Sequence, residues 1–436
     1  MNTTNPVQTV TYALLALMLL LAGAVACSDD SDDGGDSGGG GGGGSTCEEG
    51  NPVCSAWVLN TSERSALLRG TDGEGYLVNV QSAEQVTEGG EDFIYVQATG
   101  VPNYSFTLTQ AQYDALLARP NASTDFRDGA PTVSVGDSIE FGTDIGLSSN
   151  TNCEQGAGYG FWPPGPECPS DVSHQAYFPL SPEPATQDCF TGLGTMGLWV
   201  NGVSIYTWSD GQSYNNEGSW TNLAGVAEIY DVDLCGGHAA NGDYHHHTDP
   251  TCVGQQVGDD GSEHSPLYGF AADGYPMYGP WQASGSRAQS CWKTRDYASA
   301  DAPTGCGGGG VRTCVLVDLF DITQGTTPAD NPGPNTSEIV ATLSGNMLEA
   351  SSGYYFEDYY YDPDCTAQGG AFLDEHNGHD HDGLGYHYHT TDTFPFNIGP
   401  TFAGRLRSNA LTTCVDSYKG GFPTGGGMMG GGMPRP

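Results

Sequence analysis

Short runs of alternating apolar and polar residues, separated by glycine, proline, asparagine and aspartate, dominate this chain. Such runs at residues 76–80, 93–96 and 315–317 predict half-buried β-strands. Residues 197–206 predict a β-hairpin, because Asn201-Gly202 at their centre is a strong two-residue turn signal. Further strands are predicted at residues 227–234 and 354–361.

One helix is predicted at residues 110–118, where Thr109 can cap the N-terminus and apolar side chains form a stripe. Residues 151–188 and 323–334 are predicted to be loops, because they are rich in glycine and proline. The 66 glycines and 26 prolines of the 436-residue chain favour many turns over long helices. We therefore expect a mainly β fold, with a sandwich-like β core, long disulfide-linked loops and few short helices.

The N-terminus has the pattern of an export signal. Residues 12–26 form an apolar run that is shorter than the about 20 residues needed to span a bilayer, and Cys27 follows it directly. Cys27 resembles the lipidated cysteine of bacterial lipoproteins. Residues 1–26 are accordingly predicted to be a signal peptide, and the Gly/Asp/Ser-rich residues 27–46 a flexible tether. We expect a lipid-anchored protein of the bacterial cell envelope, at the outer membrane, with secretion as the alternative.

Charge and cysteine content narrow the partners and the compartment. Fifty-three acidic residues against twelve basic ones give a net charge of -41, which disfavours binding to nucleic acid or anionic lipid headgroups. Removing Cys27 from thirteen cysteines leaves twelve, and an exported chain with an even number of cysteines is expected to form disulfides. The short-range candidate pairs are Cys47 with Cys54, Cys153 with Cys168, and Cys306 with Cys314.

Two histidine clusters are the most informative feature of the sequence. Ten of the eleven histidines fall within residues 238–264 and 376–389. The clusters contain Tyr244-His245-His246-His247 and Tyr386-His387-Tyr388-His389. Since alternate side chains of a strand share one face, each motif presents an H-x-H pair. The chain has no nucleophile elbow, no P-loop, no H-E-x-x-H helix and no EF-hand pattern.

Paired imidazoles on one face of a strand bring two nitrogen donors toward one metal ion. His245, His247, His387 and His389 are therefore the first-choice ligands, and the two pairs together could complete a single four-nitrogen site. His238 and His264 are supporting candidates, with His376, His379 and His381 nearby. Imidazole donors suit transition metals, with Cu or Zn expected here. The alternative is a metal-free hydrogen-bond network of histidines and tyrosines. Asp273 is interpreted either as a turn residue or as a carboxylate that orients an imidazole.

Several blocks of the chain strongly resemble the YHYH-domain proteins, a largely exported family whose activity is not established. They are His264-Ser265-Pro266-Leu267-Tyr268-Gly269-Phe270-Ala271-Ala272-Asp273-Gly274-Tyr275-Pro276-Met277-Tyr278-Gly279-Pro280, the motif at 242–247, and Gly385-Tyr386-His387-Tyr388-His389. The chain departs from the family pattern at His246, where a tyrosine is expected, and at His376, where a cysteine is expected.

The resemblance spans residues 198–405 and organises the prediction. We expect an N-terminal β-rich region at 47–150, the YHYH domain at 151–418, and a disordered Gly/Met tail at 419–436. The leading hypothesis is an extracytoplasmic protein that binds a transition metal through its paired histidines. The alternatives are a metal-dependent oxidase or hydrolase, in which Tyr244, Tyr386 or Asp273 assists proton transfer, and a metal-free structural or adhesive surface protein.

Overall fold

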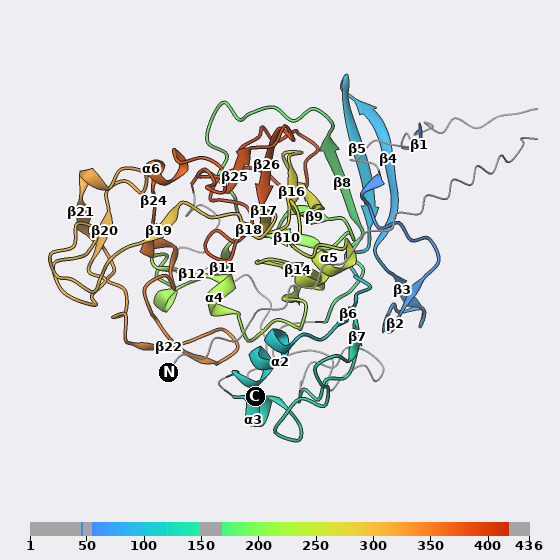
Figure 1. Cartoon of the computed structure of the whole chain (residues 1–436), viewed down its shortest axis with the longest axis horizontal. Helices are drawn as coiled ribbons and strands as arrows, with labels where there is room; N and C mark the ends of the chain where they lie inside the picture. The colour runs from blue at the N-terminus through green and yellow to red at the C-terminus, as the bar shows by residue number, and fades with distance from the viewer. Residues whose placement is uncertain (1–44, 47–54, 120, 149–167, 418–436) are drawn as a thin grey trace, which may run out of the picture. The chain divides into compact units, whose positions relative to one another are not determined.

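Two larger β-sheets organise the fold in a computed structural model that describes residues 45–46, 55–119, 121–148 and 168–417 (Figure 1). The predicted signal peptide, Cys27, nearly all of the tether and the C-terminal tail lie outside these residues. Within them, no helix is both long enough and apolar enough to cross a bilayer.

The smaller of the two sheets joins the N-terminal region to the later part of the chain. Its strand order is β1-β4-β5-β8, and Figure 1 shows the blue β4 and β5 beside the green β8. The strands are β1 (Ser45–Thr46), β4 (Val80–Glu88), β5 (Glu91–Ala98) and β8 (His174–Pro179). β5 pairs antiparallel with β8 over its whole apolar length.

The larger sheet has eight strands in the order β13-β14-β10-β9-β15-β16-β26-β25. It is mixed, because β10 pairs parallel with β14 and β16 pairs parallel with β26. Its strands are β9 (Thr195–Trp199), β10 (Ser204–Tyr206), β13 (Gly237–Ala240), β14 (Asp243–His246), β15 (Leu267–Ala271), β16 (Pro276–Tyr278), β25 (Gly378–Asp380) and β26 (Tyr386–His389).

The larger sheet is an internal repeat with a two-fold pattern. One half of the sheet consists of the hairpins β9-β10 and β13-β14, and the other half consists of β15-β16 and β25-β26. Hairpin β9-β10 corresponds to β15-β16, and β13-β14 corresponds to β25-β26. The halves meet where β9 pairs antiparallel with β15. Both central strands approach closely at a glycine. A Cβ on Gly197 would lie 2.9 Å from the Cα of Ala271, and a Cβ on Gly269 would lie 2.9 Å from the Cα of Trp199. Only glycine fits such a close backbone approach.

The two sheets pack face to face through large apolar side chains. Leu198 of β9 and Phe270 of β15 share a buried cluster with strands β4, β5 and β8. The Trp57 ring stacks between Phe178 and Phe270, with centroids 5.5 Å from each. The opposite face of the larger sheet packs on a second apolar cluster. The predicted mainly β fold is thus confirmed.

The remaining described strands form two-stranded ladders, and the helices are short. The strands are β2 (Arg64–Arg69), β3 (Gly75–Leu77), β6 (Ser105–Thr107), β7 (Ser138–Glu140), β11 (Ser209–Ser213), β12 (Thr221–Leu223), β17 (Trp281–Ala283), β18 (Ser286–Arg287), β19 (Trp292–Thr294), β20 (Cys314–Leu316), β21 (Thr326–Pro328), β22 (Ile339–Ala341), β23 (Met347–Glu349) and β24 (Tyr359–Tyr361). The helices are α2 (Gln110–Leu117), α3 (Ala122–Asp125), α4 (Ala224–Ala227), α5 (Thr251–Gln256), α6 (Pro363–Thr366), and the 3-10 turns η1 (Tyr214–Asn216), η2 (Ile322–Gln324) and η3 (Phe356–Asp358).

Local predictions succeeded where the signal was a cap or a turn. The predicted helix is α2, and Thr109 forms a capping box with Gln112. The predicted strand at 227–234 is wrong, because Asp233 accepts hydrogen bonds from the backbone N–H groups of Cys235 and Gly237 and bends the chain into turns. The strand predicted at 354–361 is reduced to β24 by the turn η3, and the loop predicted at 323–334 contains β21.

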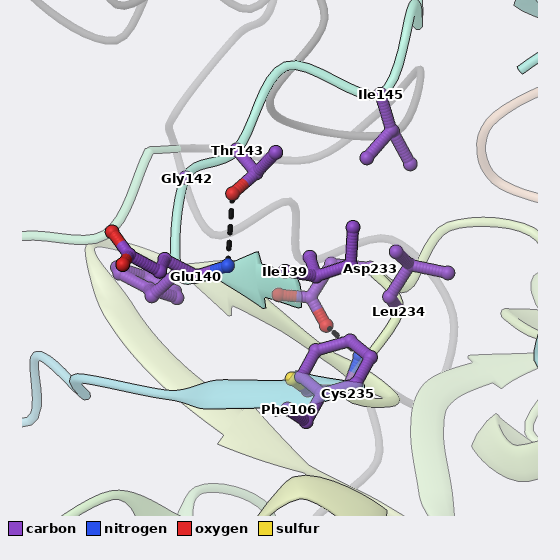
Figure 2. A pocket seen from close by; sticks show the side chains of 10 residues that line it. Phe106, Ile139, Glu140, Gly142, Thr143, Ile145, Asp233, Leu234 and Cys235 are labelled. Atoms are coloured by element: carbon purple, nitrogen blue, oxygen red, sulfur yellow. Dashed lines mark hydrogen bonds between the residues drawn. The ribbon is translucent and has the colours of Figure 1, made fainter. Parts of the chain in front are cut away.

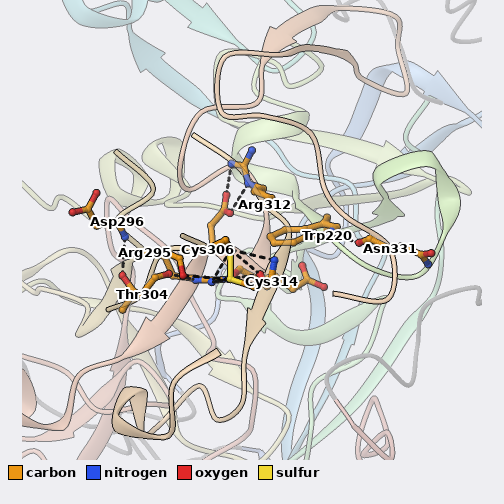
Figure 3. The surroundings of a disulfide bond; sticks show 11 residues. Trp220, Arg295, Asp296, Thr304, Cys306, Arg312, Cys314 and Asn331 are labelled. Atoms are coloured by element: carbon orange, nitrogen blue, oxygen red, sulfur yellow. Dashed lines mark hydrogen bonds and ion pairs between the residues drawn. A yellow bond between two sulfur atoms is a disulfide. The ribbon is translucent and has the colours of Figure 1, made fainter. Parts of the chain in front are cut away.

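A segment between β16 and β25, residues 281–373, is held by disulfides and a buried ion pair. The disulfides Cys291–Cys365 and Cys306–Cys314 both lie in it, and the second confirms a predicted pair (Figure 3). Arg312, with no exposed surface, donates to both carboxylate oxygens of Asp358 at 2.7 Å, and three backbone carbonyls take its other N–H groups.

Two more disulfides, Cys189–Cys414 and Cys235–Cys252, stabilise the rest of the described chain. The predicted pairs of Cys47 with Cys54 and of Cys153 with Cys168 include residues outside the described ranges. The four disulfides of the described residues are typical of a protein that folds in an oxidising compartment outside the cytoplasm.

Candidate metal centres

The first histidine cluster forms a buried triad at one end of the larger sheet. His238 on β13 pairs directly with His245 on β14, so both side chains lie on one face, and His247 follows two residues later on that face. The ligand atoms of the three side chains lie within 4.8 Å of one another, and each residue is at most 7 % exposed. His246 points to the opposite face, where its Nε2 lies 3.3 Å from the Tyr104 hydroxyl.

Backbone carbonyls determine which nitrogen of each ring faces the centre of this triad. The Nδ1 atoms of His238, His245 and His247 contact the carbonyl oxygens of Asp231, Asp243 and Thr207. A carbonyl oxygen only accepts hydrogen bonds, so each Nδ1 carries a hydrogen and each Nε2 faces the centre of the triad. The Nε2 atoms of His245 and His247 are 3.1 Å apart. This is the arrangement by which imidazoles bind a metal ion.

The second cluster forms a corresponding triad at the other end of the sheet. His387 and His389 lie on one face of β26 with no exposed surface, and His264 approaches them from the segment before β15. Their Nδ1 atoms lie 2.6 to 2.8 Å from backbone carbonyl oxygens. All three Nε2 atoms are buried without a hydrogen-bond partner within the described ranges. A buried polar atom without a partner is costly, so this convergence indicates a ligand site.

Burial keeps most of these imidazoles neutral, which is the form that binds metals. Desolvation holds the pKa of His245 and of His389 well below the ordinary histidine value. Desolvation also lowers the pKa of His247 and of His387. His238 is the exception, because the nearby Glu228 carboxylate raises its pKa against the opposing effect of burial.

The prediction that the two H-x-H pairs converge on one four-nitrogen site is wrong. Strands β10, β9, β15 and β16 lie between β14 and β26. The two pairs are therefore separated by five strand spacings, each of about 4.8 Å, which is about 24 Å across the sheet. The structure instead joins all six predicted ligands in two separate groups, His238 with His245 and His247, and His264 with His387 and His389.

The tyrosines of the two motifs support the strands from the other face. Tyr244 donates to Asp233 at 2.6 Å, and Tyr386 donates to Asp374 at 2.9 Å. Asp233 also lines a small pocket beside β6 and β7 that includes no histidine (Figure 2). Burial raises the pKa of both tyrosines well above the ordinary value. Because both hydroxyls lie on the face away from the triads, neither tyrosine is placed to transfer a proton at a triad.

Two other tyrosines, not predicted from the sequence, lie against the triads. The Tyr206 ring stacks on His245 with centroids 3.6 Å apart, and the Tyr278 ring lies 5.0 Å from that of His387. Asp273 serves as a turn residue, because it accepts the Tyr275 N–H, and its second oxygen accepts the Tyr388 hydroxyl on the face away from the triad.

Two potential donors complete the surroundings of the triads. Glu228, in the turn after α4, was not among the predicted ligands, and its Oε2 lies 3.2 Å from His238 Nε2. His379 on β25 pairs with His387, and the centroids of the two rings are 4.8 Å apart. His376 and His381 are outside both triads and partly exposed. A comparison of the two halves of the sequence would have shown that His379 and His238 hold the same position relative to the H-x-H pairs.

Comparison with protein families places the chain in a known family. The model described as "YHYH protein" matches residues 175–404 and includes both triads. The match begins upstream of residues 198–405, where the sequence resembles the family, and takes in β9 and nearly all of β8. Comparisons with curated proteins and with solved structures gave no match.

Proposed function

Because the chain belongs to the YHYH protein family, we propose that its shared domain binds transition-metal ions at two histidine triads outside the cytoplasm. The observation that carries the proposal is the convergence of buried Nε2 atoms in both triads, with every Nδ1 engaged by a backbone carbonyl. Structural and catalytic zinc and copper sites use neutral imidazoles held in this way. Cu²⁺ and Zn²⁺ are the ions best suited to such donors.

The test is the number of ions bound per chain. Protein stripped with a chelator is titrated with Zn²⁺ and with Cu²⁺, and bound metal is measured by elemental analysis after gel filtration. Wild-type protein is expected to bind two ions. The variant with His245→Ala and His247→Ala is expected to bind one, because only the first triad is lost.

His376→Ala is the matched control, because it removes a partly buried imidazole outside both triads. It should retain both ions, and circular dichroism of each metal-free variant checks the fold. Binding that is unchanged by the double substitution would refute the assignment of the first triad. Absence of binding would favour the metal-free structural role, and turnover that depends on the bound ion would favour the oxidase or hydrolase.

The location of the protein is part of the same proposal. Four described disulfides and membership of an exported family support a place outside the cytoplasm. We propose that a lipid on Cys27 anchors the chain to the cell envelope. Labelling with a radioactive fatty acid should mark the wild-type chain and not the Cys27→Ser variant. Labelling of both would contradict the anchor.

A further inference from the structure

The internal repeat supplies three equivalent histidines to each half of the sheet. His238 and His379 follow a glycine on the outer strands β13 and β25, and each pairs directly with the first histidine of the neighbouring motif. The Nδ1 atoms of the last histidines, His247 and His389, contact carbonyls of Thr207 and Gly279, which occupy the same position after β10 and β16. The equivalent sets are therefore His238, His245, His247 and His379, His387, His389.

The fourth side chain differs between the halves. In the first half it is Glu228, whose Oε2 lies 3.2 Å from His238 Nε2 and 3.4 Å from His247 Nε2. This oxygen is buried and faces both imidazole nitrogens. The Nε2 atoms of His245 and His247 are 3.1 Å apart. Together with the two distances from Glu228, this gives three separations between candidate ligand atoms. A tetrahedral ion with bonds of about 2.05 Å requires ligand separations of about 3.3 Å.

In the second half the fourth side chain is a histidine, His264. Its ring lies 5.0 Å from His389 and 5.5 Å from His387, centroid to centroid. His379 faces the same two rings at 5.0 and 4.8 Å, and its Nδ1 contacts the Gly370 carbonyl. The Nε2 atoms of all four histidines are buried without a hydrogen-bond partner in the part of the chain that the structure describes.

We propose that the two halves hold unlike metal centres, one with three imidazoles and the Glu228 carboxylate, and one with four imidazoles. This inference rests on the proposed metal binding and adds the complete ligand sets. The anionic carboxylate offsets one charge of a divalent ion at the first centre, whereas the second centre offers neutral donors alone. Four nitrogen donors favour Cu²⁺ in particular, while a carboxylate broadens the choice of metal.

Electron paramagnetic resonance of Cu²⁺ tests the inference, because its spectrum distinguishes four nitrogen donors from three nitrogens and one oxygen. Wild-type protein loaded with two ions is expected to show two different signals. Glu228→Gln should weaken the affinity of the first centre by at least about 10-fold and alter its signal alone. His264→Gln and His379→Gln should each alter the signal of the second centre alone.

Glu375→Gln and His376→Gln are the controls, since both residues lie close to β25 and neither is a proposed ligand. They should leave both signals unchanged. Two bound ions with identical signals, or signals insensitive to Glu228→Gln and His264→Gln, would overturn the inference while metal binding itself stands. Failure to bind any ion would instead overturn the proposed function.

Discussion

Replacing Tyr388 by phenylalanine tests how the opposite face of the sheet supports the second triad. The Tyr388 hydroxyl donates to Asp273 Oδ2 at 2.6 Å and accepts the Ala403 N–H at 2.8 Å. Tyr388 and Asp273 have no exposed surface. Phenylalanine keeps the ring and removes both hydrogen bonds. A hydrogen bond to a charged group contributes about 1.5–3 kcal/mol, and an unsatisfied N–H adds to the loss, so unfolding free energy should fall by about 2–4 kcal/mol.

The effect of Tyr388→Phe should depend on pH in a defined direction. Burial raises the pKa of Asp273, and the Tyr388 hydroxyl partly opposes that rise. Without the hydroxyl, the folded-state pKa of Asp273 rises further above its unfolded value. A group with a raised folded-state pKa loses its stabilising contribution as pH rises through that pKa. The variant should therefore approach wild type in mildly acidic buffer and fall behind it near neutrality.

Urea unfolding of metal-free protein, followed by tryptophan fluorescence at about pH 5 and about pH 7.5, measures both effects. Tyr360→Phe on β24 is the control, because Tyr360 is partly exposed. The variant should still bind two metal ions, since Tyr388 lies on the face away from the triad. A loss below about 0.5 kcal/mol near neutrality, or a loss that does not change with pH, would refute the reasoning.

Three further predictions concern a buried ion pair, a disulfide and a glycine of β25. Arg312→Lys should lower the free energy of unfolding, measured in urea, by about 3–5 kcal/mol, because lysine cannot replace the five N–H donors of the buried guanidinium. A loss below about 1 kcal/mol would contradict this. Removing the disulfide of Cys291 and Cys365, 74 residues apart, should cost about 4–5 kcal/mol in the same assay, and an unchanged midpoint would argue against it. Gly378→Ala places a Cβ against the ring of Tyr386, the first tyrosine of β26. Calorimetric titration should therefore show weaker metal binding at the second site alone. An equal loss of affinity at both sites would exclude this local cause.

Much of the local structure could be predicted from the sequence, because it depends on neighbouring residues. The Thr109 cap, the Asn201-Gly202 hairpin and the same-face pairing of His245 with His247 each follow from a few consecutive positions. Their physical causes, capping, turn geometry and the two-residue period of a strand, act within one element. Such features need no knowledge of the sheet.

The arrangement of the sites depends on contacts between distant segments, and the prediction failed there. The two H-x-H pairs could be joined in one site only if β14 and β26 were neighbours, whereas four strands separate them. Glu228 was missed because its segment has the alternation of a strand, and the side chain of Asp233 overrides that pattern. The repeat itself was visible as two similar runs 72 residues apart, at 197–206 and 269–278.

The repeat in the larger sheet has a consequence for how its two sites can change. In a symmetric pair of half-length chains, one substitution would appear at both sites at once. Here a continuous chain encodes each half separately, and the central pairing of β9 with β15 provides the contact that a dimer interface would otherwise supply. A mutation can therefore alter one triad while the other is preserved. Glu228 beside the first triad and His264 in the second form a contrast that two identical subunits could not carry.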